Sequence, residues 1–196
     1  GKLMNTKDTS IKKISENAEI TALKKIIGLK DRTDYSEFER ADSKWPLRYG
    51  SIIVMTDQDV DGSHIKGLLM SLFHSSWKSL LQQGFVTSLI TPIIKVFPRQ
   101  RGGRRATKSF YTMQAYEEWK SDIGVDEAKK YRTKYYKGLG TSTTEEAKGY
   151  FRDMRTVSYT WDGQNADDAL SLAFAKDRSD DRKEWISNYD PFLCLT

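Results

Sequence analysis

The spacing of apolar residues changes sharply around Gly62. The stretch before it, Ser51 to Met55, is mainly apolar, which is typical of a buried strand of a parallel sheet. After Gly62 the apolar residues recur every three or four positions, as they do on one face of a helix. They are Ile65, Leu68, Leu69, Leu72, Phe73, Trp77, Leu80 and Leu81. The pattern therefore predicts a strand, a turn and a long helix in succession.

The residues before this strand predict two short helices and an irregular segment. Apolar positions between residues 10 and 27 have helical spacing with a break after Ser15. Ser15 or Asn17 can cap the second helix, and Gly28 can end it in the left-handed conformation that glycine tolerates. Residues 31–47 are charged and irregular, and we interpret them as a surface loop.

A hairpin is predicted after a turn at Gly84. Its first strand runs from about Leu89 to Phe97, with Pro92 at an edge or bulge, and its second is Ser109–Thr112. The tip is basic and contains no acid; it carries Arg99, Arg101, Arg104, Arg105 and Lys108. A basic tip is usually just solvated, and contact with DNA is the alternative.

The remainder of the chain predicts further short elements. Helices are expected over Met113–Ser121, from Thr143 onward, over Asn165–Phe174 and over Ser179–Asn188, and strands over Tyr131–Lys137 and Val157–Trp161. The apolar residues of these helices should face inward; they include Tyr116, Trp119, Ala147, Tyr150, Phe151, Met154, Trp185 and Ile186.

Composition bounds the class of protein. The 196 residues, of which 38% are hydrophobic and 12% aromatic, suffice for one large or two small domains. The net charge of +5 permits nucleic-acid binding without establishing it. The single cysteine, Cys194, excludes an internal disulfide and fits a reducing compartment. There is no apolar run long enough for a membrane span, and the chain reads as a piece of something longer.

Lys137 to Thr143, Lys-Gly-Leu-Gly-Thr-Ser-Thr, forms a glycine-rich turn between a predicted strand and a predicted helix. Backbone amides in such a turn can meet phosphate. The spacing matches neither a Walker loop nor Gly-x-Gly-x-x-Gly. Thr143 with Glu146 has the spacing of a capping box, so a tight turn followed by a helix cap is the competing interpretation.

Asp57, Asp59 and Asp61 follow the central strand at alternate positions. Carboxylates held close together raise one another's pKa unless a cation neutralises them. Carboxylate oxygens suit Mg²⁺, and ligands in α/β sheets bind at the carboxyl ends of strands. These acids therefore predict a magnesium site, although an acidic turn that merely caps the next helix is the simpler alternative.

Two other motifs begin in a similar way. An EF-hand loop starting at Asp57 would need a glutamate at its twelfth position, where this chain has Leu68. It would also follow a helix rather than a strand, so we reject it. A phosphatase of the haloacid dehalogenase type resembles Ile53 to Val60, with Asp57 as a covalent nucleophile. The third acid and the immediate helix fit that alternative less well.

Thr56 to Leu69, Thr-Asp-Gln-Asp-Val-Asp-Gly-Ser-His-Ile-Lys-Gly-Leu-Leu, closely resembles the acidic signature of the Toprim domain in eukaryotic type IIA DNA topoisomerases. Further blocks look like that family in the same order. They are Gly1–Asn5, Glu16–Ile20, Ile90–Val96, Tyr135–Thr143 and Asp180–Trp185. The resemblance covers the chain to about Tyr189.

The resemblance implies a Rossmann-like Toprim core with a parallel sheet, followed by an α+β extension. The expected domains are 1–96 as an N-terminally truncated Toprim domain, 97–155 as an extension with the basic hairpin and glycine turn, and 156–196 leading toward a winged-helix region. It also implies an ATP-dependent type II topoisomerase that relaxes and decatenates DNA. Such an enzyme is a nuclear homodimer that acts on double-stranded DNA, with no membrane association.

Site residues follow from the same resemblance. Two Mg²⁺ ions would act in the site, about 3.5–4 Å apart in the general scheme. Asp57 would bind both, Asp59 would bind the second, and Asp61 would support them. The lysines at family positions that touch the DNA backbone are Lys2, Lys13, Lys137 and Lys176; solvated surface is the alternative for each.

Three parts of the family's machinery have no counterpart here. The catalytic glutamate of a Glu-Gly-Asp-Ser-Ala motif is expected before Gly1, and the nucleophilic tyrosine and the ATPase domain lie elsewhere. We therefore expect this chain alone neither to cleave DNA nor to hydrolyse ATP. A non-catalytic DNA-binding module that uses only its basic surface is a third hypothesis.

Overall fold

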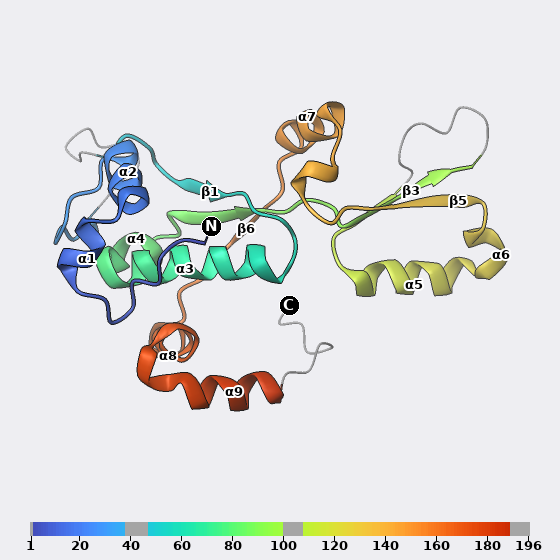
Figure 1. The fold of residues 1–196 in the computed structure, drawn as a ribbon. Coiled ribbons are helices and arrows are strands. Elements are labelled where there is room, and N and C mark those ends of the chain that lie inside the picture. The colour runs from blue at the N-terminus through green and yellow to red at the C-terminus, as the bar shows by residue number, and fades with distance from the viewer. Residues whose placement is uncertain (1, 38–46, 100–107, 189–196) are drawn as a thin grey trace. The chain divides into compact units, whose positions relative to one another are not determined.

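A computed structural model describes residues 2–37, 47–99 and 108–188 (Figure 1). Helices and short strands are mixed along the chain, so the predicted α/β class is confirmed. The residues group into two compact units. The first comprises Gly1–Ile52, Ile65–Thr87 and Ser158–Thr196, and the second comprises Ile53–His64 and Ser88–Val157. Each unit is described separately.

Two short helices open the first unit, as predicted. They are α1 (Ile11–Ser15) and α2 (Ala18–Ile27). The side chain of Asn17 accepts a hydrogen bond from the backbone N–H of Ile20 and so caps α2. Gly28 ends α2 with a φ of 87°, a conformation in which glycine meets no Cβ penalty.

The core of the first unit forms around the predicted long helix, which is divided into α3 (Val60–Ser76) and α4 (Lys78–Gln82). Most of its predicted apolar face is buried, although Ile65 and Leu69 are only half-buried. The buried side chains include Leu68, Leu72, Phe73, Trp77, Leu80, Leu81 and Phe85. The rings of Phe73 and Trp77 meet edge to face, with centroids 5.6 Å apart, and Gly84 turns the chain with a φ of 67°.

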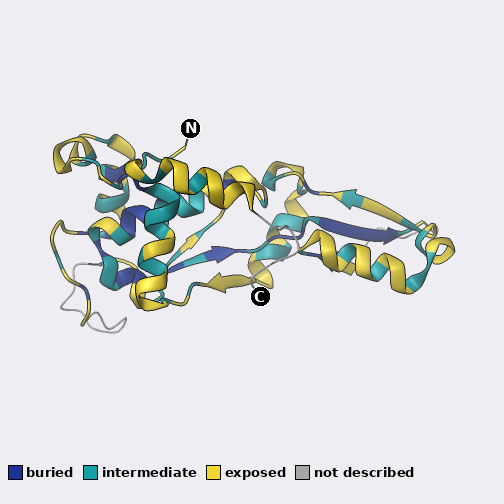
Figure 2. Cartoon of the chain, turned by 90° about the horizontal axis from the view of Figure 1, so that it is seen from below, coloured by how far each residue is buried: buried dark blue, intermediate teal, exposed yellow. Residues whose placement is uncertain are grey.

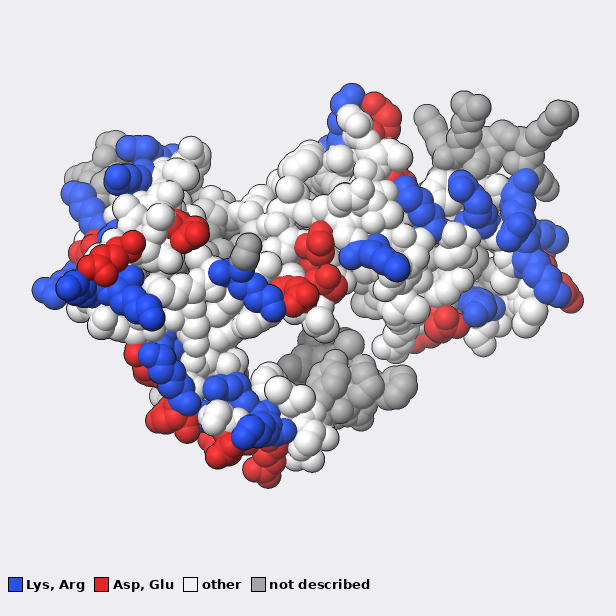
Figure 3. Space-filling view, in the orientation of Figure 1, with Lys and Arg blue, Asp and Glu red and all other residues white. Residues whose placement is uncertain are grey.

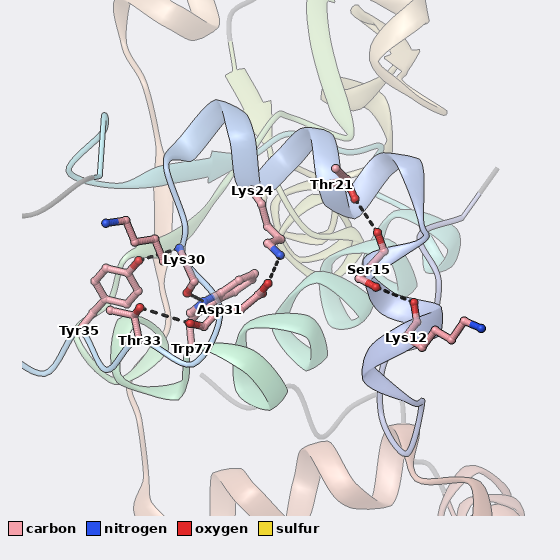
Figure 4. A network of polar contacts seen from close by, with 9 residues as sticks. All are labelled: Lys12, Ser15, Thr21, Lys24, Lys30, Asp31, Thr33, Tyr35 and Trp77. Atoms are coloured by element: carbon pink, nitrogen blue, oxygen red, sulfur yellow. Dashed lines mark hydrogen bonds and ion pairs between the residues drawn. The ribbon is translucent and has the colours of Figure 1, made fainter.

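Tyr35 shows that the predicted surface loop contributes to this core. Its side chain is fully buried, and its hydroxyl accepts a hydrogen bond from the backbone N–H of Lys30. The indole of Trp77 donates to the carbonyl of Lys30 at 2.8 Å. Lys24 pairs with Asp31 beside them (Figure 4). The part of this loop at residues 38–46 lies outside the described residues.

Two later helices, α8 (Gly163–Phe174) and α9 (Ser179–Ser187), complete the first unit. A short 3₁₀ turn, η2 (Lys176–Arg178), joins them. The prediction that Trp185 and Ile186 pack inward is wrong, because these side chains are 54% and 66% exposed. Ser179 is the first residue of α9 rather than its cap.

One three-stranded sheet has the order β1–β2–β6, with strands β1 (Ile52–Val54), β2 (Val86–Leu89) and β6 (Thr156–Ser158). The central strand β2 is largely buried, whereas β1 is at an edge and Ile53 is 42% exposed (Figure 2). The prediction that the strand before the acids is buried is therefore only partly right. β6 starts one residue earlier and ends three residues earlier than expected.

The strand predicted from Leu89 to Phe97 begins only at Ile94, as β3 (Ile94–Pro98), while Leu89 is the last residue of β2. Pro92 lies in the break between them, because proline has no N–H to donate to a ladder. In the second unit, β3 pairs antiparallel with β4 (Lys108–Phe110) and with β5 (Tyr131–Tyr135). The hairpin is thus confirmed, while its tip at residues 100–107 lies outside the described residues.

Ile94, Val96 and Phe110 form the core of the second unit. Helix α5 (Met113–Ile123) covers it with the half-buried rings of Tyr116 and Trp119, as predicted, and the four-residue α6 (Val125–Ala128) follows. Figure 3 shows Lys and Arg side chains over the part that holds β3 and β5.

Among the described residues of the second unit, helix α7 (Thr144–Arg152) is the last helix in the chain. Its expected inward face is only partly buried, because Phe151 and Met154 are 60% and 48% exposed. A 3₁₀ turn, η1 (Leu139–Thr141), precedes it, and this turn is part of the candidate site.

Candidate metal centre

The acidic loop belongs to the second unit and is held by its own backbone. The carboxylate of Asp59 accepts a hydrogen bond of 2.7 Å from the backbone N–H of Gly62, and the carbonyl of Asp59 accepts from Ser63 at 3.0 Å. Asp59 therefore caps α3, because an N-cap carboxylate satisfies an N–H that has no partner within the helix. The simpler alternative, an acid that caps the helix, is present at this residue and leaves its other oxygen for a ligand.

Gly62 is required by the way the loop folds back on itself. A Cβ at this position would lie 2.0 Å from the carbonyl oxygen of Asp57. A further hydrogen bond holds the loop: the side-chain amide of Gln58 donates to the backbone carbonyl of Leu89 at 3.1 Å. The hydroxyl of Thr56 is buried and has no hydrogen-bond partner among the described residues. The loop is thus a tight turn with one unpaired polar atom beneath it.

The glycine-rich turn contacts the acidic loop. The backbone N–H of Leu139 donates a hydrogen bond of 2.7 Å to Oδ1 of Asp57. A Cβ on Gly138 would lie 2.6 Å from Oδ2 of the same carboxylate, so glycine is needed for this approach. The backbone amide that could have met phosphate therefore meets a carboxylate within the protein.

All three predicted ligands, Asp57, Asp59 and Asp61, are exposed. Within the described ranges, the structure gathers no group of three or more His, Cys, Asp or Glu side chains that could hold a metal ion. It brings Asp57 to the glycine-rich turn and Asp59 to the start of α3, rather than bringing the three carboxylates together.

The four predicted DNA-contacting lysines are exposed and lie in different units. Lys137 begins the glycine-rich turn in the second unit, whereas Lys2, Lys13 and Lys176 belong to the first. The ammonium group of Lys176 donates to the carbonyl of Asp8 at 2.9 Å, and its backbone N–H donates to the carboxylate of Asp8. Lys176 is therefore oriented by its own unit.

Sequence reasoning missed a charged cluster behind the glycine-rich turn. The capping box of Thr143 and Glu146 is confirmed, but Glu146 also accepts hydrogen bonds from the side chains of Lys134 and Tyr136. Lys95 lies 3.9 Å from the same carboxylate. The alternation of β3 and β5 could have indicated that Lys95 and Lys134 share a face, because they are register partners.

The pKa values in this cluster follow from burial and hydrogen bonding. Burial raises the pKa of Glu146, but hydrogen bonds from Lys134, Tyr136 and the backbone of Thr143 outweigh it and lower the pKa to about 2. Burial lowers the pKa of Lys95, and the charge of Glu146 opposes that shift. Burial and the hydrogen bond to Glu146 raise the pKa of Tyr136. Glu146 is thus ionised at neutral pH.

A family model described as the C-terminal associated domain of TOPRIM matches residues 89–195, more than half of the chain. The chain belongs to this TOPRIM_C family. The matched range includes the glycine-rich turn and the Glu146 cluster, and it starts after the acidic loop.

Other relatives are similar over nearly the whole chain, so the region of similarity includes the acidic loop. DNA topoisomerase 2-alpha of Homo sapiens is 48% identical over 191 residues, which are 96% of this chain and 12% of that protein. DNA topoisomerase 2-beta of Mus musculus is 46% identical over 96% of this chain and 11% of that protein. The resemblance to eukaryotic type IIA topoisomerases is thereby confirmed.

A solved structure is similar across the same range. It is named as the Plasmodium falciparum topoisomerase II DNA-binding, cleavage and re-ligation domain. The TM-score is 0.80 at 42% identity, over 97% of this chain and 25% of that one. Compared with the full-length curated relatives, this TOPRIM_C chain spans about one eighth of their length. No helix within the described ranges could cross a membrane.

Proposed function

We propose that this chain supplies the metal-binding acids of an ATP-dependent type II DNA topoisomerase, which cleaves and religates both strands of DNA by transesterification and so relaxes and decatenates it. One observation carries the proposal: the similarity, over 97% of the chain, to a structure named for DNA binding, cleavage and re-ligation. The attack by a tyrosine on a backbone phosphate belongs to the same family chemistry.

The fold proposed for the acid-bearing part is a Rossmann-like Toprim core with a parallel sheet. Strands β1 and β2 are neighbours and are joined through α3 and α4, which is the long connection that parallel strands need. We propose domain boundaries at 1–96 for the truncated Toprim domain, 97–155 for the extension and 156–196 for the segment toward a winged-helix region.

The donor chemistry of the acidic loop fits Mg²⁺. Carboxylate oxygens are its preferred protein ligands, and Mg²⁺ usually keeps waters and phosphate oxygens besides one or two carboxylates. As the family resemblance implies, Asp57 would bind both ions and Asp59 the second, with Asp61 in support. The unpaired hydroxyl of Thr56 leaves a further polar atom beneath the loop. When bound, Mg²⁺ would neutralise charge on the reacting phosphate and on the leaving oxygen.

The protein's own groups would position rather than react. Asp59 caps α3 and so fixes the loop, while the N–H of Leu139 holds one oxygen of Asp57 and orients the other. The lysines proposed to contact the DNA backbone are Lys2, Lys13, Lys137 and Lys176. Lysine acts there as a point charge that sets position without reading sequence. The complete protein would work in the nucleus as a homodimer.

Other reacting groups would come from outside this chain. The family resemblance implies that the catalytic glutamate, the nucleophilic tyrosine and the ATPase domain would come from other segments, and this chain covers about an eighth of the curated relatives' length. We therefore expect these 196 residues alone neither to relax plasmid DNA nor to hydrolyse ATP. Plasmid relaxation by the isolated chain would refute that expectation.

The direct test replaces Asp57 and Asp59 by alanine, singly and together, in the complete enzyme. Cleavage should be abolished while DNA binding is largely kept, because the acids hold the metal and the lysines hold the DNA. Asp126→Ala is the matched control, since this acid is exposed in the same unit and pairs with Lys129. Cleavage by the double variant at the level of the control would remove the metal assignment.

The same proteins separate the alternatives. A dehalogenase-type phosphatase would form an acyl phosphate on Asp57 and hydrolyse a small phosphate ester without DNA. A non-catalytic binding module would bind DNA equally well with both acids replaced, would not cleave it with wild-type acids, and would gain nothing from added Mg²⁺. DNA cleavage that requires both acids and Mg²⁺ supports only the topoisomerase assignment.

A further inference from the structure

The contact between the glycine-rich turn and Asp57 involves no flexible side chain of the turn. It consists of the Leu139 N–H, 2.7 Å from Oδ1, and of the bare Cα of Gly138 packed against the carboxylate. Because a backbone donor moves only with its chain, the orientation of Asp57 depends on where residues 137–142 are held.

Within the turn, the hydrogen bonds are few and local. The N–H of Thr141 donates to the carbonyl of Gly138 at 3.1 Å, and that of Ser142 donates to Leu139 at 3.1 Å. These bonds shape the turn but do not attach it to the rest of the unit. The side-chain hydroxyl of Ser142 lies at hydrogen-bond distance, 3.0 Å, from that of Tyr150 in α7. The turn is otherwise attached through the end of β5 before it and the start of α7 after it.

Glu146 joins those two segments. Its carboxylate accepts the backbone N–H of Thr143 at 2.8 Å on the α7 side. On the β5 side it accepts the ammonium of Lys134 at 2.8 Å and the hydroxyl of Tyr136. A capping box requires only the first of these bonds. The other two therefore have a role beyond capping: they close the chain across the turn, from residue 136 to residue 143.

The charges around Glu146 make this closure depend on its negative charge. Lys95 and Lys134 are direct register partners on β3 and β5, and like charges placed opposite each other destabilise a strand pair. Lys95 is buried and lies near the rings of Tyr136 and Tyr150, at 5.3 and 4.8 Å. The carboxylate of Glu146 meets both ammonium groups, so its loss would leave two cations facing each other beneath the turn.

We propose that Glu146 is a positioning residue for the metal centre: by tying β5 to the start of α7, it holds the Leu139 N–H on Asp57 and sets how that carboxylate presents its second oxygen to a divalent cation. The proposal rests on the proposed function for the role of Asp57. Outer groups that orient a metal ligand typically change metal affinity or activity by about 10–100-fold when they are removed.

Glu146→Gln and Glu145→Ala in the complete enzyme form the matched pair. Glutamine keeps the size and an acceptor for the Thr143 N–H but loses the charge that Lys95 and Lys134 meet. Glu145 is on the same first turn of α7, is 80% exposed and pairs with Lys148, so its removal deletes one charge without touching β5. Glu146→Ala removes both the charge and the acceptor for the Thr143 N–H.

The first readout is independent of activity. Hydrogen exchange of the metal-free enzyme should show faster exchange of the peptide over residues 137–143 in both Glu146 variants, and unchanged exchange in Glu145→Ala. The second is the Mg²⁺ concentration that gives half-maximal DNA cleavage. It should rise by about ten-fold in Glu146→Gln, with cleavage recovered at saturating Mg²⁺.

The outcomes separate this proposal from the one it rests on. If Asp57→Ala keeps cleavage, the function proposed for the loop fails. If Asp57→Ala abolishes cleavage while Glu146→Gln matches Glu145→Ala in both exchange and Mg²⁺ dependence, Glu146 is a helix cap and the positioning role is refuted. Loss of cleavage in Glu146→Gln that saturating Mg²⁺ does not recover would also refute it, because a positioning defect in ligand orientation is one that mass action offsets.

Discussion

Leu139 donates its backbone N–H to the carboxylate of Asp57, at 2.7 Å and across 82 positions of sequence. The bond joins the glycine-rich turn to the first of the acids that follow β1. It also occupies one carboxylate oxygen and leaves the other, so the two motifs that the sequence presents separately are parts of one site.

Gly138→Ala should disturb this site without unfolding the protein. The backbone φ of Gly138 is −175°, which any residue adopts, but a Cβ would lie 2.6 Å from Oδ2 of Asp57. We expect the carboxylate to swing away and the hydrogen bond from Leu139 to be lost. The measurement is Mg²⁺-dependent DNA cleavage by the complete enzyme, which should need about ten-fold more Mg²⁺.

Gly140→Ala is the control for that variant, since a Cβ there meets no heavy atom within 4 Å. Gly140 lies in the same turn, and its substitution by alanine adds the same methyl group. Equal Mg²⁺ requirements for the two alanine variants would contradict the close approach of Gly138 to Asp57.

Gly62→Ala should destabilise the acidic loop. Its Cβ would lie 2.0 Å from the backbone carbonyl of Asp57, which cannot move aside as a side chain can. Overpacking of this kind typically costs about 1–3 kcal/mol. Denaturant titration should show the loss, and hydrogen exchange should place it in the loop and the start of α3.

Gly149→Ala should have the opposite effect on stability, because this glycine is in a helix. It lies within α7, where a Cβ would meet nothing within 4 Å, and alanine favours helix over glycine by about 0.5–1 kcal/mol. A stabilised Gly149→Ala beside a destabilised Gly62→Ala is the expected pair. If Gly62→Ala left the free energy of unfolding unchanged, the close approach of Gly62 to the carbonyl of Asp57 would be contradicted.

Glu146 should make stability depend on acid pH. Its pKa is lowered to about 2 in the folded protein, from an ordinary value of 4.5. A depressed pKa contributes stability that is fully present above the ordinary value and is lost as the pH falls from about 4.5 toward 2. Glu146→Gln should be less stable than wild type at neutral pH, and this difference should shrink over that interval. A pH-independent difference would contradict the shift.

Asp167 should anchor α8 within the first unit. Its carboxylate meets His74 at 2.6 Å and Lys78 at 2.8 Å, and these hydrogen bonds lower its pKa. Asp167→Ala should therefore speed hydrogen exchange in α8. Asp168→Ala is the neighbouring control, because that exposed carboxylate accepts a hydrogen bond from Gln164 of the same helix. Identical exchange in the two variants would rule out the anchor.

Local chemistry made part of this structure predictable. Asn17 and Gly28 bound α2 as expected, and Thr143 with Glu146 forms the expected capping box, because caps depend on residues three or four positions apart. The apolar face of α3 was predictable for the same reason. The acids at the end of β1 could be recognised as a candidate site from their residue type and their place after a strand.

Long-range contacts account for what the sequence could not show. Nothing in the spacing of Gly138 and Asp57 indicates that they touch. Tyr35 is in a charged segment and is nevertheless buried, whereas Trp185 has helical spacing and is exposed. Burial is decided by tertiary neighbours, which periodicity within one helix does not reveal.

The second unit is made from residues 53–64 together with 88–157, and this has a consequence for synthesis. A ribosome delivers the acidic loop long before the residues that receive it, at about 5–20 residues per second. Until the stretch from Tyr131 to Tyr150 has emerged, Asp57 has no amide to bind and the two facing lysines have no carboxylate between them. Nascent chains that end before Leu139 should therefore expose the acidic loop without the backbone N–H that binds Asp57 in the folded protein.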